Sequence, residues 1–477
     1  MCSSRAPTTG SSGPNRSRSD PHLESRYRSP SASLPGVTVS DVRVPHARIL
    51  VVLAALAVSA AILLLTHGYT FYFDEWAFIL GAPDWTPITY LQPHNGHPSM
   101  LTRLIYTALL STVGLRSYLP YMAVLLALHA TSAVLLFELV RQRAGDLVAI
   151  GCAALLLVIG AGWENLLWAF QLGFVGSVAS GLGMLLALES TARRRMPIVV
   201  ALLTASLMFS VIGLFFGVAA GVRLVASRER RTEVLWLVPV AIVFGAWFLT
   251  FGLHNAESGS PAPNRNISVL PLYTVWGLGA SAAGLIGEGG WLGIPLLLLA
   301  AGAIGFAWSR GGFDSFALGV AVALVFFYIV TGLARGQIGY EQSGAGRYVY
   351  VGAVFWLILL GDAARRLPWR GTWRPALVAL LFLACFNSGA VLVEIGTAKA
   401  AQMQRQMADL QALAAVRGNP CLNPNGAVDP LVMPVETSPA LYYRAIDRYG
   451  DPSTGLPIVD RADFDQAKAN LQSPGCK

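Results

Sequence analysis

Residues 49–66 read ILVVLAALAVSAAILLLT, an apolar run without a single charged side chain. A helix of about 20 apolar residues crosses the roughly 30 Å of hydrocarbon in a bilayer, so this run predicts a membrane span. Runs of similar composition recur as far as residue 393, separated by short polar connections. Their repetition predicts an all-α polytopic protein of the cell membrane, and it excludes a secreted protein with one signal peptide.

The composition agrees with this fold class and excludes others. The chain has 477 residues, of which 54% are hydrophobic and 13% charged, against roughly 25% charged residues in a soluble domain. Its net charge of +8 comes from arginines clustered between apolar runs, so the charge indicates membrane topology rather than binding to nucleic acid. The five cysteines include no CxxC pair, which argues against a zinc ribbon or a redox motif.

The N-terminal segment differs in composition from the rest. Residues 1–48 are rich in Ser, Pro and Arg and cannot bury enough apolar surface to fold, so we expect a disordered cytoplasmic tail. Its arginines precede the first apolar run, which places the N-terminus in the cytoplasm by the positive-inside rule. Residues 67–100 then form a long first outer loop.

Further spans are expected at residues 119–140, 147–161, 170–189, 234–253, 316–333, 348–360 and 375–392. Residues 197–225 lie between two basic clusters but are too short for two full helices, which predicts a tight hairpin of short helices or a re-entrant pair. Two apolar segments, 269–286 and 291–308, separate an outer loop from the cytoplasmic Arg310, so one of them should not cross. The glycine-rich first segment is the candidate for an interfacial or re-entrant helix. The total is about 10 to 12 transmembrane or re-entrant helices.

The apolar runs define a transmembrane domain over residues 49–393. Residues 394–477 are expected to form a small extracytoplasmic C-terminal domain, starting with a helical stretch near 398–416. Cys421 and Cys476 both fall in this domain, where an oxidising compartment would permit a disulfide between them. The sequence leaves open whether they pair.

The first outer loop carries two adjacent acids, Asp74 and Glu75, flanked by aromatic residues. Partial desolvation near the membrane surface tunes the pKa of a carboxyl group, which suits either acid to act as a general base. The alternative is that both acids cap a short interfacial helix while the aromatic residues belong to the interfacial belt.

The second and third outer loops also carry unusual polar residues. In the second, Glu164 lies between Trp163 and Trp168, which could stack on a sugar and bind its hydroxyl groups or could simply anchor a helix end. In the third, Arg335 and Arg347 lie on the outer side, against the positive-inside trend.

A guanidinium binds phosphate through a planar fork of donors, so a lipid phosphate at the headgroup boundary would explain both arginines. Their alternatives are pairing with Glu341 or with ordinary phospholipid. Glu341 and Tyr348 belong to the same loop and complete this set of candidates for substrate binding.

His94, Asn95 and His97 in the first outer loop are candidates for substrate binding, and the two histidines could form part of a metal site with Asp74 or Glu75 as further ligands. The Asn-Gly step between the histidines indicates a turn, and the spacing sets no third ligand. Hydrogen bonding to an acceptor or to loop backbone is therefore favoured. We assign no metal ligand, and a divalent cation stays open as a cofactor.

These loops resemble those of the GT-C superfamily of membrane glycosyltransferases. The likeness rests on an acid after the first span, an acid in the second outer loop, and an Arg and Tyr cluster in a late outer loop, and it spans most of residues 49–393. The stretches FDEW, PHNGHPS, GLRSYLPY and GWENLLWAFQ, within residues 72–171, are also similar to uncharacterised multi-pass membrane proteins of actinobacteria.

The resemblance implies transfer of a sugar from a polyprenyl-phosphate carrier to a cell-envelope glycan, lipid or protein acceptor, on the outer face of the cytoplasmic membrane. It assigns the family's first acid to Asp74, with Glu75 beside it, and its second acid to Glu164. Asp74 would deprotonate or orient the acceptor hydroxyl, and Arg335 or Arg347 would stabilise charge on the departing phosphate. The chain departs from the family in having Asp followed by Glu rather than two aspartates, and it lacks a WWD-type acceptor motif.

Two other functions fit the same residues. A transporter or flippase for a lipid-linked glycan would line its path with these acids and arginines, although transporters more often place charges near the midplane and show internal repeats. A non-enzymatic membrane scaffold that displays the C-terminal domain would leave the loop acids without a role.

Overall fold

The computed structural model describes residues 43–253, 263–311, 314–365, 373–424, 426 and 438–473. Most of these residues are helical, and their one sheet is a two-stranded hairpin. Nine helical segments in the described ranges are long and apolar enough to span a bilayer. They contain α1 (Ala47–Leu65), α4 (Leu119–Ala144), α7 (Leu172–Leu188), α10 (Val238–Trp247), α11 (Pro263–Gly284), α12 (Gly293–Gly311), α13 (Ser315–Arg335), α14 (Gly346–Ala364) and α15 (Trp373–Ala415).

Three shorter apolar helices accompany these spans, α5 (Asp146–Leu157), α8 (Arg195–Phe209) and α9 (Gly213–Ala226). Helices α8 and α9 pack on each other across a turn at residues 210–212, which confirms the expected hairpin of short helices. The chain is therefore an all-α polytopic membrane protein. The predicted disordered tail, residues 1–48, lies mostly outside the described residues.

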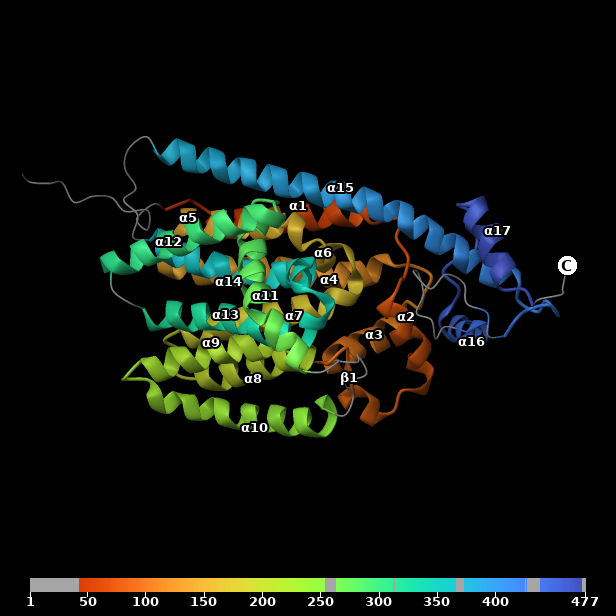
Figure 1. Ribbon diagram of the computed structural model, residues 1–477, viewed down its shortest axis with the longest axis horizontal. Coiled ribbons are helices and arrows are strands. Elements are labelled where there is room, and N and C mark those ends of the chain that lie inside the picture. Colours follow the sequence, from red (N-terminus) through yellow and green to blue (C-terminus); the bar gives the residue numbers. More distant parts are fainter. Residues whose placement is uncertain are drawn as a thin grey trace, which may run out of the picture. The chain divides into compact units, whose positions relative to one another are not determined.

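Helix α11 is the glycine-rich segment for which an interfacial or re-entrant path is expected. It packs against α12, α13 and α14 and against the loop that follows α13. Figure 1 shows α11 running across these three helices, which lie roughly along one another. This orientation agrees with a helix that does not cross the membrane, and its depth in the bilayer stays a prediction.

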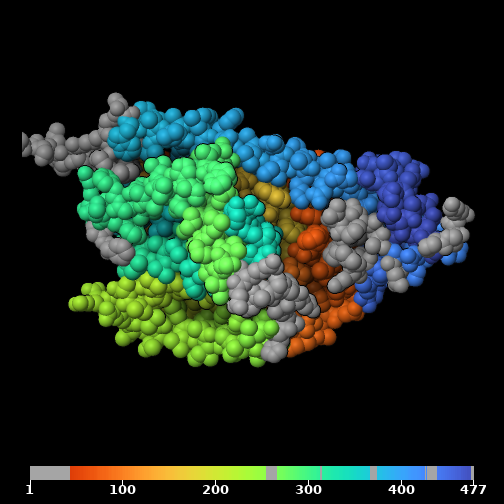
Figure 2. All heavy atoms as spheres, in the orientation of Figure 1, coloured from red at the N-terminus to blue at the C-terminus, as the bar shows by residue number. Residues whose placement is uncertain are grey.

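Helix α15 is longer than a membrane span. Its 43 residues extend about 65 Å at 1.5 Å per residue, roughly twice the thickness of the hydrocarbon core. The expected span at 375–392 and the expected helical stretch near 398–416 are thus one continuous helix, because no proline interrupts residues 376–415. Figure 2 shows α15 along one edge of the visible face, reaching the C-terminal helices.

The first loop connects α1 to α4 and is well structured. It contains α2 (Asp74–Gly81), the 3-10 turns η2 (Ala82–Asp84) and η3 (Pro87–Leu91), the strands β1 (Pro93–His94) and β2 (His97–Pro98), and α3 (Met100–Thr112). Asn95 and Gly96 join the two strands with φ angles of 50° and 80°. Positive φ at both central residues is the type I′ geometry that Asn-Gly favours, so this turn brings the two histidines opposite each other.

The second and third loops are short, and each contains two or three helical segments of three to five residues. The second loop, between α5 and α7, contains η4 (Gly160–Gly162), α6 (Glu164–Leu167) and η5 (Ala169–Gln171). The third loop, between α13 and α14, contains η9 (Gly336–Ile338) and η10 (Tyr340–Gly344).

The C-terminal segment adds α16 (Pro439–Tyr449) and α17 (Arg461–Asn470). Helix α16 docks on the first loop, since the Leu115 amide donates to the Tyr449 carbonyl at 2.9 Å and Arg444 pairs with Asp84 at 2.6 Å. Cys421 is disulfide-bonded, and the Ser473 amide donates to its carbonyl at 2.8 Å. Its predicted partner, Cys476, lies outside the described residues.

Ion pairs join the helices at the end of the bundle opposite the first loop. Arg143 at the end of α4 bonds Asp314 before α13 and Asp362 near the end of α14. In the same region, Glu189 after α7 pairs with Arg223 of α9 at 2.9 Å. The Asp362 side chain is only 1% exposed, so its charge depends on these arginines.

Replacing Arg143 by methionine should destabilise the fold. Breaking a buried ion pair from one side costs roughly 3–5 kcal/mol, and the loss should fall near the lower end because Arg365 remains 3.4 Å from Asp362. The measurement is thermal unfolding of the purified protein in detergent. As a control, Arg461→Met removes a pair whose arginine is 72% exposed and should change stability by less than about 0.5 kcal/mol. Equal effects of the two substitutions would contradict this account.

Candidate active site

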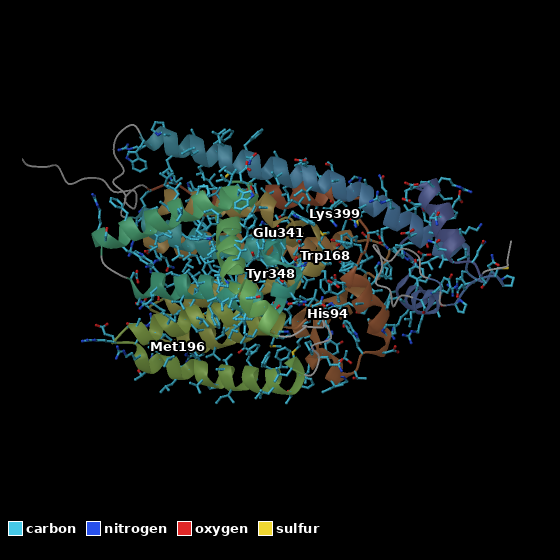
Figure 3. The ribbon with its side chains drawn as sticks, viewed as in Figure 1. His94, Trp168, Met196, Glu341, Tyr348 and Lys399 are labelled. Atoms are coloured by element: carbon cyan, nitrogen blue, oxygen red, sulfur yellow. The ribbon has the colours of Figure 1, made fainter. Side chains whose placement is uncertain are left out.

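The three loops surround one cavity of about 440 Å³. Seven of the twelve predicted site residues line it, namely Asp74, His94, Asn95, His97, Arg335, Arg347 and Tyr348. The other five, Glu75, Trp163, Glu164, Trp168 and Glu341, do not belong to its lining. Figure 3 shows His94 and Trp168 near the first loop, whereas Met196 at the start of α8 lies toward the other end of the bundle.

Asp74 enters the cavity from the first turn of α2. The residue before it, Phe73, has φ 52° and ψ −123°, a conformation that costs a non-glycine residue on the order of 1–3 kcal/mol. Phe73 also lines the cavity, as does Asn95, which has positive φ as well. The Asn95 conformation suits its Asn-Gly turn, whereas the strained backbone at Phe73 indicates that the surrounding structure fixes the position of Asp74.

His94 and Asn95 lie next to the Asp74 carboxylate. Asn95 Nδ2 donates to Asp74 Oδ2 at 3.4 Å, and His94 Nε2 is 3.9 Å from Asp74 Oδ1. The His94 ring is held edge-on by Phe78 and Phe170. Its buried Nε2 has no hydrogen-bond partner among the described residues, so this nitrogen is available to a ligand or to Asp74.

His97 has a different role in the same hairpin. Its Nδ1 lies 3.0 Å from Ser210 Oγ, and its ring packs against Phe174. Burial, together with the positive charge of Arg335, lowers the pKa of His97 to about 3. The ring is therefore neutral at physiological pH, and it joins the first loop to the turn between α8 and α9.

Both predicted arginines are held by groups from other loops. Arg335 Nη2 donates to the Asn95 carbonyl at 2.9 Å, which connects the third loop to the hairpin. Arg347 Nη1 bonds Glu164 at 3.0 Å, and Asn165 Nδ2 donates to the Arg347 carbonyl at 3.2 Å. A guanidinium has five N–H donors, so each arginine retains capacity for an anionic ligand in the cavity.

Glu164 thus binds an arginine instead of lining the cavity. The sequence left open a pairing of the third-loop arginines with Glu341, but the structure pairs Arg347 with Glu164, and Glu341 is exposed. The sequence analysis missed Lys399 of α15, which donates to Tyr72 Oη at 3.1 Å and lies over the Trp163 ring. No motif or spacing pointed to Lys399, because only the fold brings α15 beside the loops.

Glu75 points into the protein interior, away from the cavity. Adjacent residues on a helix project about 100° apart, so Asp74 and Glu75 cannot face the same space. Glu75 is fully buried and accepts hydrogen bonds from the Tyr72 amide, Tyr106 Oη and Tyr118 Oη. Burial raises the pKa of Glu75 to about 8, although these hydrogen bonds act in the opposite direction.

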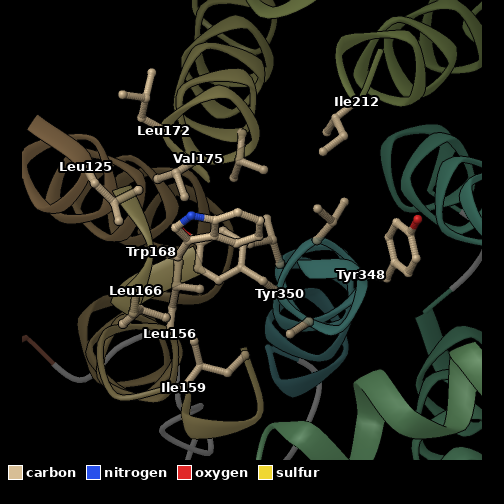
Figure 4. Close-up of a cluster of buried hydrophobic side chains, with 14 of the residues drawn as sticks. Leu125, Leu156, Ile159, Leu166, Trp168, Leu172, Val175, Ile212, Tyr348 and Tyr350 are labelled. Atoms are coloured by element: carbon tan, nitrogen blue, oxygen red, sulfur yellow. The ribbon is translucent and has the colours of Figure 1, made fainter. Parts of the chain in front are cut away.

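Trp168 belongs to the hydrophobic core behind the cavity. It is 4% exposed and lies between two other rings. Its ring centroid is 5.0 Å from that of Tyr72 and 5.5 Å from that of Phe170. Figure 4 shows its indole among apolar side chains that include Val175 and Tyr350. A ring packed on both sides cannot stack on a sugar, so Trp168 supports the wall.

Several lining residues carried no signal in the sequence. They come from α7, the end of α8 and the turn after it, and include Phe174, Phe209 and Ser210. Within the described residues no group of three or more His, Cys, Asp or Glu side chains could hold a metal ion.

Comparison with protein families, with curated proteins and with solved structures found no match for this chain.

Glu75→Gln should preserve the fold and reduce the pH dependence of stability. The folded protein holds this proton more tightly than the unfolded chain, since the pKa rises from 4.5 to about 8. Its stabilising contribution is thus complete below pH 4.5 and is lost as the pH rises through about 8. Thermal unfolding of the wild type should shift to lower temperature between about pH 5 and about pH 9, and this shift should shrink in Glu75→Gln.

Glu341→Gln is the matched control for this experiment, because Glu341 is an exposed acid of the third loop. It should keep the pH dependence of the wild type. A Glu75→Gln variant with an unchanged pH profile would show that Glu75 does not titrate as described.

Proposed function

We propose that the chain is a membrane glycosyltransferase of the GT-C type, which moves a sugar from a polyprenyl-phosphate donor to a cell-envelope acceptor. The observation that carries the proposal is that the Asp74 carboxylate and the guanidinium groups of Arg335 and Arg347 line a single cavity. Transfer of a sugar from a phosphate leaving group to a hydroxyl acceptor requires these two kinds of group, a base for the acceptor and cations for the phosphate.

Asp74 is the proposed general base. The acceptor oxygen attacks the anomeric carbon, its proton passes to Asp74, and the bond from that carbon to the phosphate oxygen breaks. The electron pair of that bond leaves with the phosphate, where Arg335 and Arg347 offset the negative charge. Direct displacement inverts the anomeric centre.

Neighbouring residues position these groups. The Asn95 side chain donates to Asp74, and its carbonyl accepts from Arg335. One hairpin turn therefore contacts both the proposed base and a proposed phosphate-binding group. Glu164 fixes Arg347 from the second loop. Preformed placement of charge lowers the reorganisation needed during the reaction.

The distribution of charge favours an outer location for the cavity. Arg143 and Arg223 lie at the opposite end of the bundle, and basic residues are enriched on the cytoplasmic side. The proposed topology therefore has the N-terminus in the cytoplasm and the cavity and C-terminus outside, where lipid-linked sugars are the donors at hand.

The same arrangement favours an enzyme over a transporter. The ion pairs of Arg143 and Glu189 cross-link α4, α7, α9, α13 and α14 at the end opposite the cavity. The cavity residues come from loops and helix ends, whereas a transport path requires polar groups near the midplane.

Asp74→Asn should abolish glycosyl transfer with little effect on the fold, because the amide keeps the shape of the carboxylate but cannot accept the proton. A lost general base lowers the rate by about 10² to 10⁴. The measurement is the glycan and glycolipid profile of cells in which the deleted gene is replaced by each variant, with protein abundance checked in membranes.

The matched control is Asp84→Asn, in the same loop but outside the cavity, with a side chain that is 64% exposed. It should restore the wild-type profile. If deletion changes the profile and Asp74→Asn restores it, Asp74 is not the base.

A further inference from the structure

One part of the cavity lining is polar but uncharged. It comes from the start of α3, the second loop, the start of α7 and the end of α8, and none of its side chains is an acid, a lysine or an arginine. We name this part the neutral wall, and its main members are Thr102, Gln171, Phe174, Phe209 and Ser210. The proposed base and the phosphate-binding arginines lie on other segments, so the steps proposed above give the neutral wall no role.

Two side chains of the neutral wall are buried without a hydrogen-bond partner. Thr102 is 3% exposed and Gln171 is 4% exposed. Neither Thr102 Oγ1 nor Gln171 Oε1 has a partner among the described residues. A buried polar atom without a partner destabilises the fold, and for this reason nearly all such atoms are bonded. Two exceptions in the lining of one cavity point to a ligand that supplies the missing bonds.

The Thr102 hydroxyl differs from those of the other threonines in α3. Thr107 and Thr112 donate to backbone carbonyls one turn earlier, at 2.8 Å and 2.7 Å. Such a bond to its own helix is the usual way for a helical threonine to satisfy its hydroxyl. The space before the Thr102 hydroxyl stays open because residue 173 of α7 is glycine, where a Cβ would lie 2.8 Å from Thr102 Oγ1.

His94 adds a third unpartnered atom, its buried Nε2. The three atoms together require a ligand that both donates and accepts hydrogen bonds. The amide oxygen of Gln171 only accepts, the Thr102 hydroxyl does both, and a ring nitrogen of a neutral histidine does one or the other. A sugar hydroxyl can pair with each of them. A phosphate or carboxylate oxygen only accepts, so it cannot pair with Gln171 Oε1.

We infer that Thr102, Gln171 and His94 bind hydroxyl groups of the transferred sugar and that this sugar carries no carboxylate. The inference rests on the proposed function and deepens it by naming the class of sugar and the residues that select it. A carboxylate at the neutral wall would meet an acceptor oxygen of Gln171 and would lie in the same cavity as the Asp74 carboxylate, and both repel it.

The hairpin relates the neutral wall to the reacting atoms. In-line displacement puts the anomeric carbon between the base and the phosphate, and the turn at Asn95 contacts a proposed group of each kind. His94, the preceding residue, packs against Phe170 of the second loop with ring centroids 5.3 Å apart. A sugar ring held at that carbon therefore borders the segment that carries Gln171.

The experiment measures lipid binding to the purified full chain by native mass spectrometry. The probes are undecaprenyl phosphate alone and undecaprenyl phosphate that carries glucose, galactose, mannose, arabinose or glucuronate. At least one of the neutral sugars should tighten binding relative to the bare lipid, and glucuronate should not. The inference is overturned if no neutral sugar tightens binding, or if glucuronate binds as tightly as the best neutral sugar.

Two substitutions in α3 form a matched pair. Thr102→Val removes the hydroxyl but keeps the shape of the side chain, and it should weaken binding of the best sugar-bearing lipid about 3- to 10-fold, as expected for one lost hydrogen bond. Binding of bare undecaprenyl phosphate should not change. Thr112→Val removes a hydroxyl that bonds its own helix and lies outside the cavity lining, and it should bind every probe as the wild type does. Unchanged binding by Thr102→Val would show that the neutral wall holds only water.

The stability of the ligand-free protein distinguishes a binding residue from a structural one. Thr102→Val should not lower the unfolding temperature, because the substitution removes a buried polar atom that has no partner. A lower unfolding temperature would show that the hydroxyl stabilises the fold and would contradict its assignment to the sugar.

Asp74→Asn separates this inference from the proposed function. It should lose glycosyl transfer but keep the tighter binding of the sugar-bearing lipid, because Asp74 acts on the acceptor. If Asp74→Asn still forms product while Thr102→Val loses sugar binding, the neutral wall is supported and the proposed base is contradicted. If Asp74→Asn loses product while Thr102→Val binds as the wild type does, the base is supported and the neutral wall is contradicted.

Discussion

The arrangement of the loops depends on one buried carboxyl group, that of Glu75. It accepts hydrogen bonds from Tyr106 of α3 and Tyr118 before α4, and Tyr118 in turn accepts from the Ala169 amide of the second loop. A buried polar group that loses its partner costs about 1–3 kcal/mol, so this cluster strongly favours one arrangement of the segments. The position of Asp74 at the cavity follows, because Asp74 directly precedes Glu75 in the first turn of α2.

Hydrogen bonds between loops then fix the charges that face the cavity. Arg347 is held by Glu164 and Arg335 by the Asn95 carbonyl, so each of the two arginines that flank the third loop is positioned by another loop. Asn95 also contacts Asp74. The proposed base and phosphate-binding groups therefore belong to one connected set.

The sequence predicted the spans well because hydrophobic length is a local property. It also predicted the hairpin of α8 and α9, and it identified seven residues that the fold brings to one cavity. It could not tell which of the two acids of the first loop faces the cavity, since both are adjacent acids flanked by aromatic residues. It also missed Lys399, because α15 continues as one helix past the expected domain boundary and passes beside the second loop there.

What the sequence determined by itself is the membrane architecture, since in lipid only long apolar helices satisfy their own backbone hydrogen bonds. It also determined that acids, histidines and arginines gather in three loops. Only the tertiary structure decided which of these groups share a space. Side-chain direction on α2 turns Asp74 toward the cavity and Glu75 into the core, and contacts between distant loops pair Arg347 with Glu164 instead of Glu341. Such contacts depend on packing across the whole bundle, which no local stretch of sequence encodes.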